Sequence, residues 1–179
     1  MAEERTGEAF ELGEQLTVIG RKLQVGDQAP GFELDQFDGA TMSAVRLRDT
    51  TGSVRVLTTV NSLDTPVCEV ETQRWEHFRE DLPADLIFYT VSMDLPFAQA
   101  RWRASAGVGH TLLSSHRSED FGRNYGVLLK EWRLLQRAVF VLDRDDRIAY
   151  AEYVPDQMTE PDYTAAFESA LACLGRTEA

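Results

Sequence analysis

The chain has 179 residues, of which 43% are hydrophobic and 27% are charged, and its formal net charge is −12 with a sequence pI near 4.6. This length suits one domain with a sizeable core. The acidic balance argues against nucleic acids and anionic membranes as partners, because both bind cationic surfaces.

The first quarter of the chain predicts a polar lead-in followed by short β-elements. Residues 1–14 are acidic and polar, so we expect a loose segment there and one domain over residues 15–179. Two short β-like runs in residues 16–25 surround Gly20-Arg21 and predict a hairpin. Turn signals then precede a short strand near residues 32–34.

Strands and helices alternate through the rest of the chain, which indicates an α/β fold whose mixed central sheet is flanked by helices. A polar turn joins the last two strands into a hairpin. We expect strands at residues 54–60, 86–93, 111–114, 138–142 and 148–154, and helices at residues 66–81, from Pro96 onward, at 118–125 and at 162–174.

The segment 61–68 (NSLDTPVC) follows an apolar strand and opens a helix. Pro66 suits the first helical position, with Asp64 or Thr65 as the N-cap. Cys68 then lies in the first turn, where unpaired backbone N–H groups and the helix dipole favour a thiolate, the reactive form of cysteine.

Acidic neighbours oppose this effect. Asp64, Glu69 and Glu71 would disfavour a charged sulfur, so a reactive Cys68 needs a cation that the fold brings to it. The alternative interpretation is a buried cysteine that acts as a small hydrophobic residue.

Cys68 and Cys173 are the two cysteines, too few for a disulfide framework in a chain of this length. The first 15 residues lack the apolar stretch of a secretory signal, and no segment approaches the roughly 18 apolar residues that span a bilayer. We therefore expect a cytoplasmic protein whose thiols stay reduced. The turn has Thr65 where a dithiol motif has its first cysteine, which excludes a local disulfide.

Three motifs resemble the thiol peroxidase branch of the peroxiredoxins, and the similarity extends over about residues 15–175. The motifs are residues 64–68 (DTPVC), 94–99 (DLPFAQ) and 137–143 (RAVFVLD). The resemblance implies a thioredoxin-like fold with an N-terminal β-hairpin extension and the reduction of hydroperoxides without a metal or organic cofactor.

Each matching residue inherits an implied role. Cys68 matches the cysteine that attacks the peroxide, and Thr65 matches the threonine whose hydroxyl holds the thiolate and the peroxide oxygen. Arg137 matches the arginine that stabilises the thiolate and binds the peroxide. From the residues alone, a solvated arginine at the start of a strand remains the alternative for Arg137.

The chain departs from the family pattern at two positions. Asn61 stands where the motif has a proline that shields the cysteine. Arg103 stands where this branch usually has its resolving cysteine. The resemblance therefore implies a one-cysteine variant, recycled by an external thiol such as a thioredoxin-like protein or a low-molecular-weight thiol. Cys173 is either a partly buried helical residue or a resolving cysteine acting within or between subunits.

The predicted function is thiol-dependent reduction of hydrogen peroxide and organic hydroperoxides through a sulfenic acid at Cys68. The alternative is a redox sensor or chaperone-like binding protein of the same fold, in which an oxidised Cys68 persists. Phe97 and Trp102 are expected to border the peroxide pocket together with Asn61, and the family pattern implies a homodimer. The three histidines lack the spacing of metal ligands, so we expect them on the surface or in loops: His77, His110 and His116.

Overall fold

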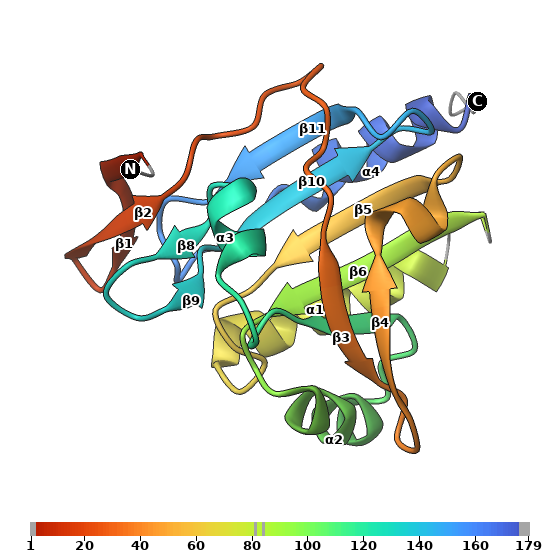
Figure 1. Cartoon of the computed structure of the whole chain (residues 1–179), viewed down its shortest axis with the longest axis horizontal. Helices are drawn as coiled ribbons and strands as arrows, with labels where there is room; N and C mark the ends of the chain where they lie inside the picture. Colours follow the sequence, from red (N-terminus) through yellow and green to blue (C-terminus); the bar gives the residue numbers. More distant parts are fainter. Residues whose placement is uncertain (1–2, 81, 84, 176–179) are drawn as a thin grey trace.

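The computed structural model describes residues 3–80, 82–83 and 85–175, and its framework is a seven-stranded sheet in the order β11-β10-β5-β6-β7-β3-β4 (Figure 1). Strands β5, β6 and β7 are parallel, whereas β10 runs antiparallel to β5 and β3 runs antiparallel to β7. The strands are β3 (Glu33–Phe37), β4 (Met42–Arg46), β5 (Val54–Thr59), β6 (Leu86–Ser92), β7 (Thr111–Ser114), β10 (Ala138–Leu142) and β11 (Ile148–Tyr153). The mixed sheet expected from the sequence is confirmed.

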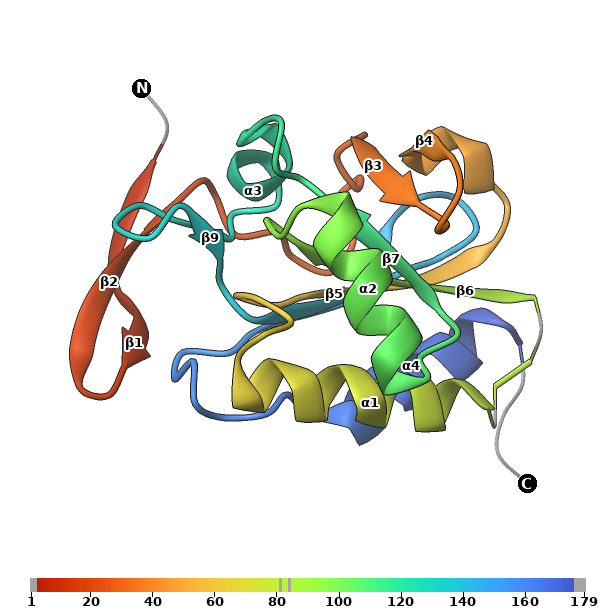
Figure 2. The same ribbon diagram turned by 90° about the horizontal axis from the view of Figure 1, so that it is seen from below.

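Helices cover both faces of this sheet. Figure 2 shows α1 (Pro66–Glu80) and α4 (Tyr163–Cys173) on one face, and α2 (Pro96–Ala106) and α3 (Asp120–Asn124) toward the other. The short 3-10 helix η1 (Leu47–Thr50) connects β4 to β5. Among the described residues, no helix combines the length and the apolar composition that crossing a membrane requires.

The two central strands are buried on both faces. All six residues of β5 and all five of β10 are buried, and β10 is apolar throughout, as expected for a strand covered on both faces. In β5 the buried polar residues have partners: Arg55 pairs with Asp146, and the hydroxyls of Thr58 and Thr59 are hydrogen-bonded. Alternate residues point to opposite faces. Leu57 and Phe140 join the core beneath α3, while Val56 and Val139 pack with Trp75 of α1 on the other face.

The N-terminal hairpin exists, but its turn lies at Leu12-Gly13, eight residues before the expected Gly20-Arg21. Strand β1 (Glu4–Glu11) pairs with β2 (Glu14–Ile19), and β8 (Leu128–Leu129) and β9 (Leu134–Leu135) complete a second, four-stranded sheet. The expectation of a loose lead-in over residues 1–14 is therefore wrong for residues 4–11, and residues 1–2 lie outside the described part of the chain.

Strand β1 was not predicted because its residues are mostly polar. Hydrogen bonds, which leave no apolar pattern in the sequence, help to anchor it. Arg5 is 8% exposed and donates to the carbonyl oxygens of Gly20 and Gly126. Its Nε also pairs with Glu8 at 2.7 Å. Ala9 is the buried apolar residue of the strand. Gly20, expected at a hairpin turn, instead follows β2 at a close backbone approach.

Replacing Gly20 by alanine is expected to lower the free energy of unfolding by roughly 2–4 kcal/mol. Gly20 has φ +104°, and an added Cβ would collide with the carbonyl oxygen of Arg123. Gly13→Ala is the matched control, because Gly13 has φ +87° but nothing within 4 Å of its added Cβ. It should cost only about 1 kcal/mol. Urea denaturation of both variants measures the difference, and equal losses would contradict the close-approach argument.

Candidate active site

The candidate site lies where β5 leads into α1. The helix begins at Pro66, directly after Thr65, and Cys68 is its third residue. The thiol is fully buried, in a cluster with Val60, Leu63, Trp102, Val108 and Leu112. Strand, turn and proline at the helix start agree with the sequence prediction.

The buried face of α1 is partly polar. Val70, an apolar residue of the helix, is 42% exposed. The buried residues are Cys68, Glu71, Thr72 and Trp75. Because residues three or four apart share a helix face, Cys68 and Glu71 point the same way, into the protein.

Arg137 supplies the cation that the sequence analysis required. It precedes β10, is fully buried, and its Nη2 donates to Cys68 Sγ at 3.4 Å. The same guanidinium bonds to the carboxylate of Glu71 and to the main-chain oxygen of Gln157, the latter at 2.9 Å. The interpretation of Arg137 as a solvated strand-end residue is therefore wrong.

One cation thus faces two acidic groups. Burial alone would lower the pKa of Arg137, but Glu71 and Cys68 more than offset it and hold that pKa above its usual value. Burial raises the pKa of Glu71 to about 7, although Arg137 acts against this rise. Near neutral pH, protonation of Glu71 therefore leaves more of the guanidinium charge to the sulfur.

The stability of the protein should depend on Glu71 between about pH 4.5 and pH 7. A carboxyl with a raised pKa keeps its proton in the folded state when the unfolded chain has lost it, so stability falls as pH rises through this window. The expected fall is about 3 kcal/mol. Urea denaturation at several pH values should show it in the parent protein. Glu71→Gln should lose this slope, while Glu69→Gln, at an exposed position, should keep it; equal slopes in all three would contradict the assignment.

Thr65 and Asn61 lie in the turn before the helix, but they bond differently from the expected pattern. The Thr65 hydroxyl donates to the main-chain oxygen of Ser62 at 2.9 Å, not to the sulfur. Asn61 is only 5% exposed, and its Nδ2 donates to Leu135 O at 2.7 Å and to Gln157 Oε1 at 3.1 Å. Replacing the motif proline by asparagine therefore does not open the site to solvent.

Of the two aromatic residues expected to border the peroxide pocket, only one lies near the sulfur. Trp102, which is 9% exposed, belongs to the buried cluster around Cys68. Phe97 is 59% exposed, and its ring packs edge-on against Phe37 at a centroid distance of 5.1 Å. Phe97 therefore lies outside the cluster around the sulfur, because it projects outward from the first turn of α2.

Cys173 lies at the opposite end of the sheet from Cys68. It ends α4 and packs against the cluster that contains Val54 and Val141. The pKa of its thiol is raised mainly by burial and to a smaller extent by the charge of the nearby Asp143. Arg137, which contacts Cys68, and Asp143, which lies near Cys173, flank the five residues of β10, a span of roughly 20 Å. A disulfide needs Cα atoms within about 7 Å, so the fold excludes an intramolecular bridge.

Comparison with known proteins identifies the family. The Redoxin family matches residues 24–167. This chain belongs to the Redoxin family. Thiol peroxidase of Halalkalibacterium halodurans is 43% identical over 163 residues, which cover 90% of this chain and 96% of that protein. Thiol peroxidase of Streptococcus sanguinis is 45% identical over 156 residues, covering 87% and 93%.

Solved structures agree with this membership. A peroxiredoxin-like protein from Aquifex aeolicus is 32% identical with a TM-score of 0.81, covering 94% of this chain and 99% of that chain. Thiol peroxidase from Chromobacterium violaceum is 25% identical with a TM-score of 0.79, covering 93% and 94%. The resemblance to the thiol peroxidase branch of the peroxiredoxins, and the thioredoxin-like fold, are confirmed.

Two residues of this Redoxin site were not predicted. Glu71 appeared in the sequence only as an unfavourable charge, although its spacing of three from Cys68 was a usable signal for a shared helix face. Gln157, which is 1% exposed, comes from a polar loop after β11 and has no sequence signal. His110 lies in the loop between α2 and β7, one of the two expected places, but it is buried there, 4% exposed and bonded to Glu76 at 2.7 Å.

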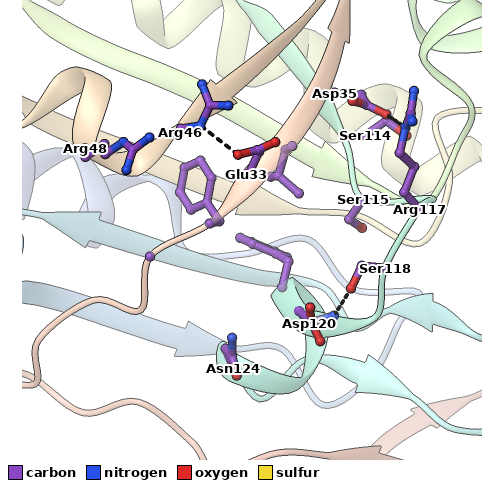
Figure 3. A pocket seen from close by; sticks show the side chains of 14 residues that line it. Glu33, Asp35, Arg46, Arg48, Ser114, Ser115, Arg117, Ser118, Asp120 and Asn124 are labelled. Atoms are coloured by element: carbon purple, nitrogen blue, oxygen red, sulfur yellow. Dashed lines mark hydrogen bonds and ion pairs between the residues drawn. The ribbon is translucent and has the colours of Figure 1, made fainter.

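A cavity in this Redoxin lies away from the sulfur. It has a volume of about 540 Å³ and is bordered by β3 and α3 (Figure 3). Arg46 pairs there with Glu33 at 2.7 Å, and Arg117 pairs with Asp35. Arg48 and Asp120 also line this cavity, whereas Cys68, Arg137 and Glu71 do not.

Proposed function

We propose that this protein is a thiol-dependent peroxidase, which reduces hydrogen peroxide and organic hydroperoxides through a sulfenic acid at Cys68. The observation that carries the proposal is the contact between the buried guanidinium of Arg137 and Cys68 Sγ, at 3.4 Å. The thiol peroxidases that resemble this chain over most of their length support the same reaction.

In the first half-reaction, the Cys68 thiolate attacks one oxygen of the hydroperoxide in line with the O–O bond. The new S–O bond forms as the O–O bond breaks, and the leaving oxygen takes a proton and departs as alcohol or water. Arg137, the Thr65 hydroxyl and the first-turn N–H groups stabilise the negative charge that develops on the oxygens. Thr65 must release Ser62 to do this. Sulfur is oxidised by two electrons to a sulfenic acid.

The second half-reaction requires a thiol from outside the chain, because Cys173 lies too far away to form an intramolecular disulfide. An external thiol condenses with the sulfenic acid, releasing water and forming a mixed disulfide. A second thiol then attacks that disulfide and regenerates Cys68. The reductant is a thioredoxin-like protein or a low-molecular-weight thiol.

The protein acts in the cytoplasm as a homodimer under this proposal. The thiol peroxidase resemblance supports both statements, and a reducing compartment suits a reactive cysteine without a built-in resolving partner. Sedimentation analysis of the reduced protein tests the dimer. A bridge between Cys173 residues or between Cys173 and Cys68 of two copies would appear on non-reducing gels after peroxide treatment.

Stopped-flow mixing with hydrogen peroxide tests the activity. Reduced protein should consume one equivalent of peroxide per chain without added thiol, and mass spectrometry should locate the sulfenic acid at Cys68. Repeated turnover should begin when thiol is added. Absence of oxidation at Cys68 would overturn the proposal. A single oxidation that added thiols fail to reverse would instead favour the redox sensor.

A further inference from the structure

A buried amide pair joins the loop before Cys68 to the loop after β11. Asn61 Nδ2 donates to Gln157 Oε1 at 3.1 Å, and the two side chains are 5% and 1% exposed. Gln157 Nε2 donates to Val154 O at 2.8 Å and to Pro155 O at 3.2 Å. Since proline has no side-chain donor, the residue of the family motif at position 61 could not make this contact.

The same glutamine holds Arg137 at two points. Its Oε1 accepts from the main-chain N–H of Arg137 at 2.8 Å, and its main-chain oxygen accepts from Arg137 Nη2 at 2.9 Å. That Nη2 is also the atom that donates to Cys68 Sγ. Arg137 Nε has no hydrogen-bond partner, so the neutral Gln157 oxygen, the Glu71 carboxylate and the sulfur fix the guanidinium.

Gln157 is itself fixed by the N-terminal hairpin. Its main-chain N–H donates to Phe10 O at 2.8 Å, and Phe10 N donates to Pro155 O at 2.7 Å. Asn61 also bonds to Leu135 O at 2.7 Å, in the strand that leads to Arg137. The pair thus links the loop before Cys68 with two segments that position Arg137: strand β9, which leads to it, and the loop after β11, which bonds to it.

We propose that Asn61 and Gln157 are positioning residues, whose buried amide contact sets the guanidinium of Arg137 against Cys68 in place of the motif proline. The proposal rests on the proposed peroxidase function, but its geometric part concerns only the charge on the sulfur. Buried polar contacts of this kind specify position because each unmade bond is costly.

The test uses Asn61→Leu, Gln157→Leu and the double variant of the full-length protein, with two readouts. Ultraviolet absorbance of the thiolate across pH reports the charge on Cys68 without any peroxide. Each single variant should move its midpoint upward by about one pH unit and slow the oxidation of Cys68 by hydrogen peroxide about 10-fold. The double variant should shift the midpoint and slow the oxidation no more than the more impaired single variant does, because the two residues act through one contact.

Tyr125→Phe is the matched control. It removes one partly buried hydrogen bond, from the Tyr125 hydroxyl to Pro30 O at 2.9 Å, beside the core on the other face of the sheet. It should lower stability to denaturant but leave the pH midpoint and the oxidation rate unchanged. A purely structural role for Asn61 and Gln157 predicts this same behaviour in their variants, and that result would overturn the proposal.

The two proposals fail in different ways. If the parent protein does not react with peroxide, the peroxidase function fails, yet the absorbance titration still tests the positioning of the guanidinium. If the parent reacts and the leucine variants keep its midpoint and rate, the positioning role fails while the peroxidase function stands.

Discussion

Replacing Arg137 by methionine is expected to slow the oxidation of Cys68 by hydrogen peroxide by about 10²–10³-fold, the usual cost of removing one preorganised donor from a developing oxyanion. The guanidinium contacts Sγ and lies in a fully buried site, where no water can replace its charge. Stopped-flow kinetics under pseudo-first-order conditions measure the rate constant. A change smaller than threefold would contradict the role of Arg137.

The same substitution also removes the partner of Glu71, and this second effect can be separated from the first. A buried carboxylate without its cation typically costs 3–5 kcal/mol. Because the pKa of Glu71 is already about 7, a proton can neutralise the group, so the loss should be largest above pH 7 and small near pH 5. Adding Glu71→Gln to Arg137→Met should recover stability above pH 7.

The double variant should nevertheless react as slowly as Arg137→Met alone, because a neutral amide cannot replace the cation beside the sulfur. Urea denaturation at pH 5 and pH 8 and peroxide kinetics on the same samples complete the test. If stability and rate recover together in the double variant, the slow reaction of Arg137→Met came from misfolding rather than from a lost charge.

Replacing Cys68 by serine is expected to abolish peroxide consumption entirely, both the single equivalent and the thiol-dependent turnover. Serine has nearly the same size and can still accept a hydrogen bond from Arg137, so the fold should persist and only the nucleophile is lost. Cys173→Ser is the control, because Cys173 lies at the far end of the sheet and takes no part in the proposed first step.

Turnover in Cys173→Ser should match that of the parent when a small-molecule thiol is supplied. A lower rate in this variant, together with disulfide-linked dimers of the parent on non-reducing gels, would instead assign resolution to Cys173 of a second copy. Peroxide consumption that survives in Cys68→Ser would remove the basis of the proposed reaction.

Local sequence determined most of the central sheet. Strand β10 was predictable because a strand covered on both faces tends to be apolar along its length, and β5 because its valines and threonines favour strands. The start of α1 was predictable because proline suits the first helical position. The N-terminal hairpin was misplaced, because β1 is anchored by Arg5 through hydrogen bonds that leave no apolar pattern in the sequence.

Within the site, the sequence by itself placed Cys68 in a first helical turn and required a cation near it, because both conclusions follow from neighbouring residues. The family motif then assigned that cation to Arg137. Only the tertiary structure decided that Glu71 shares the cation and that Gln157 holds it. These contacts join residues 66 and 20 positions apart along the chain, and such pairings depend on how strands and loops pack rather than on any local pattern.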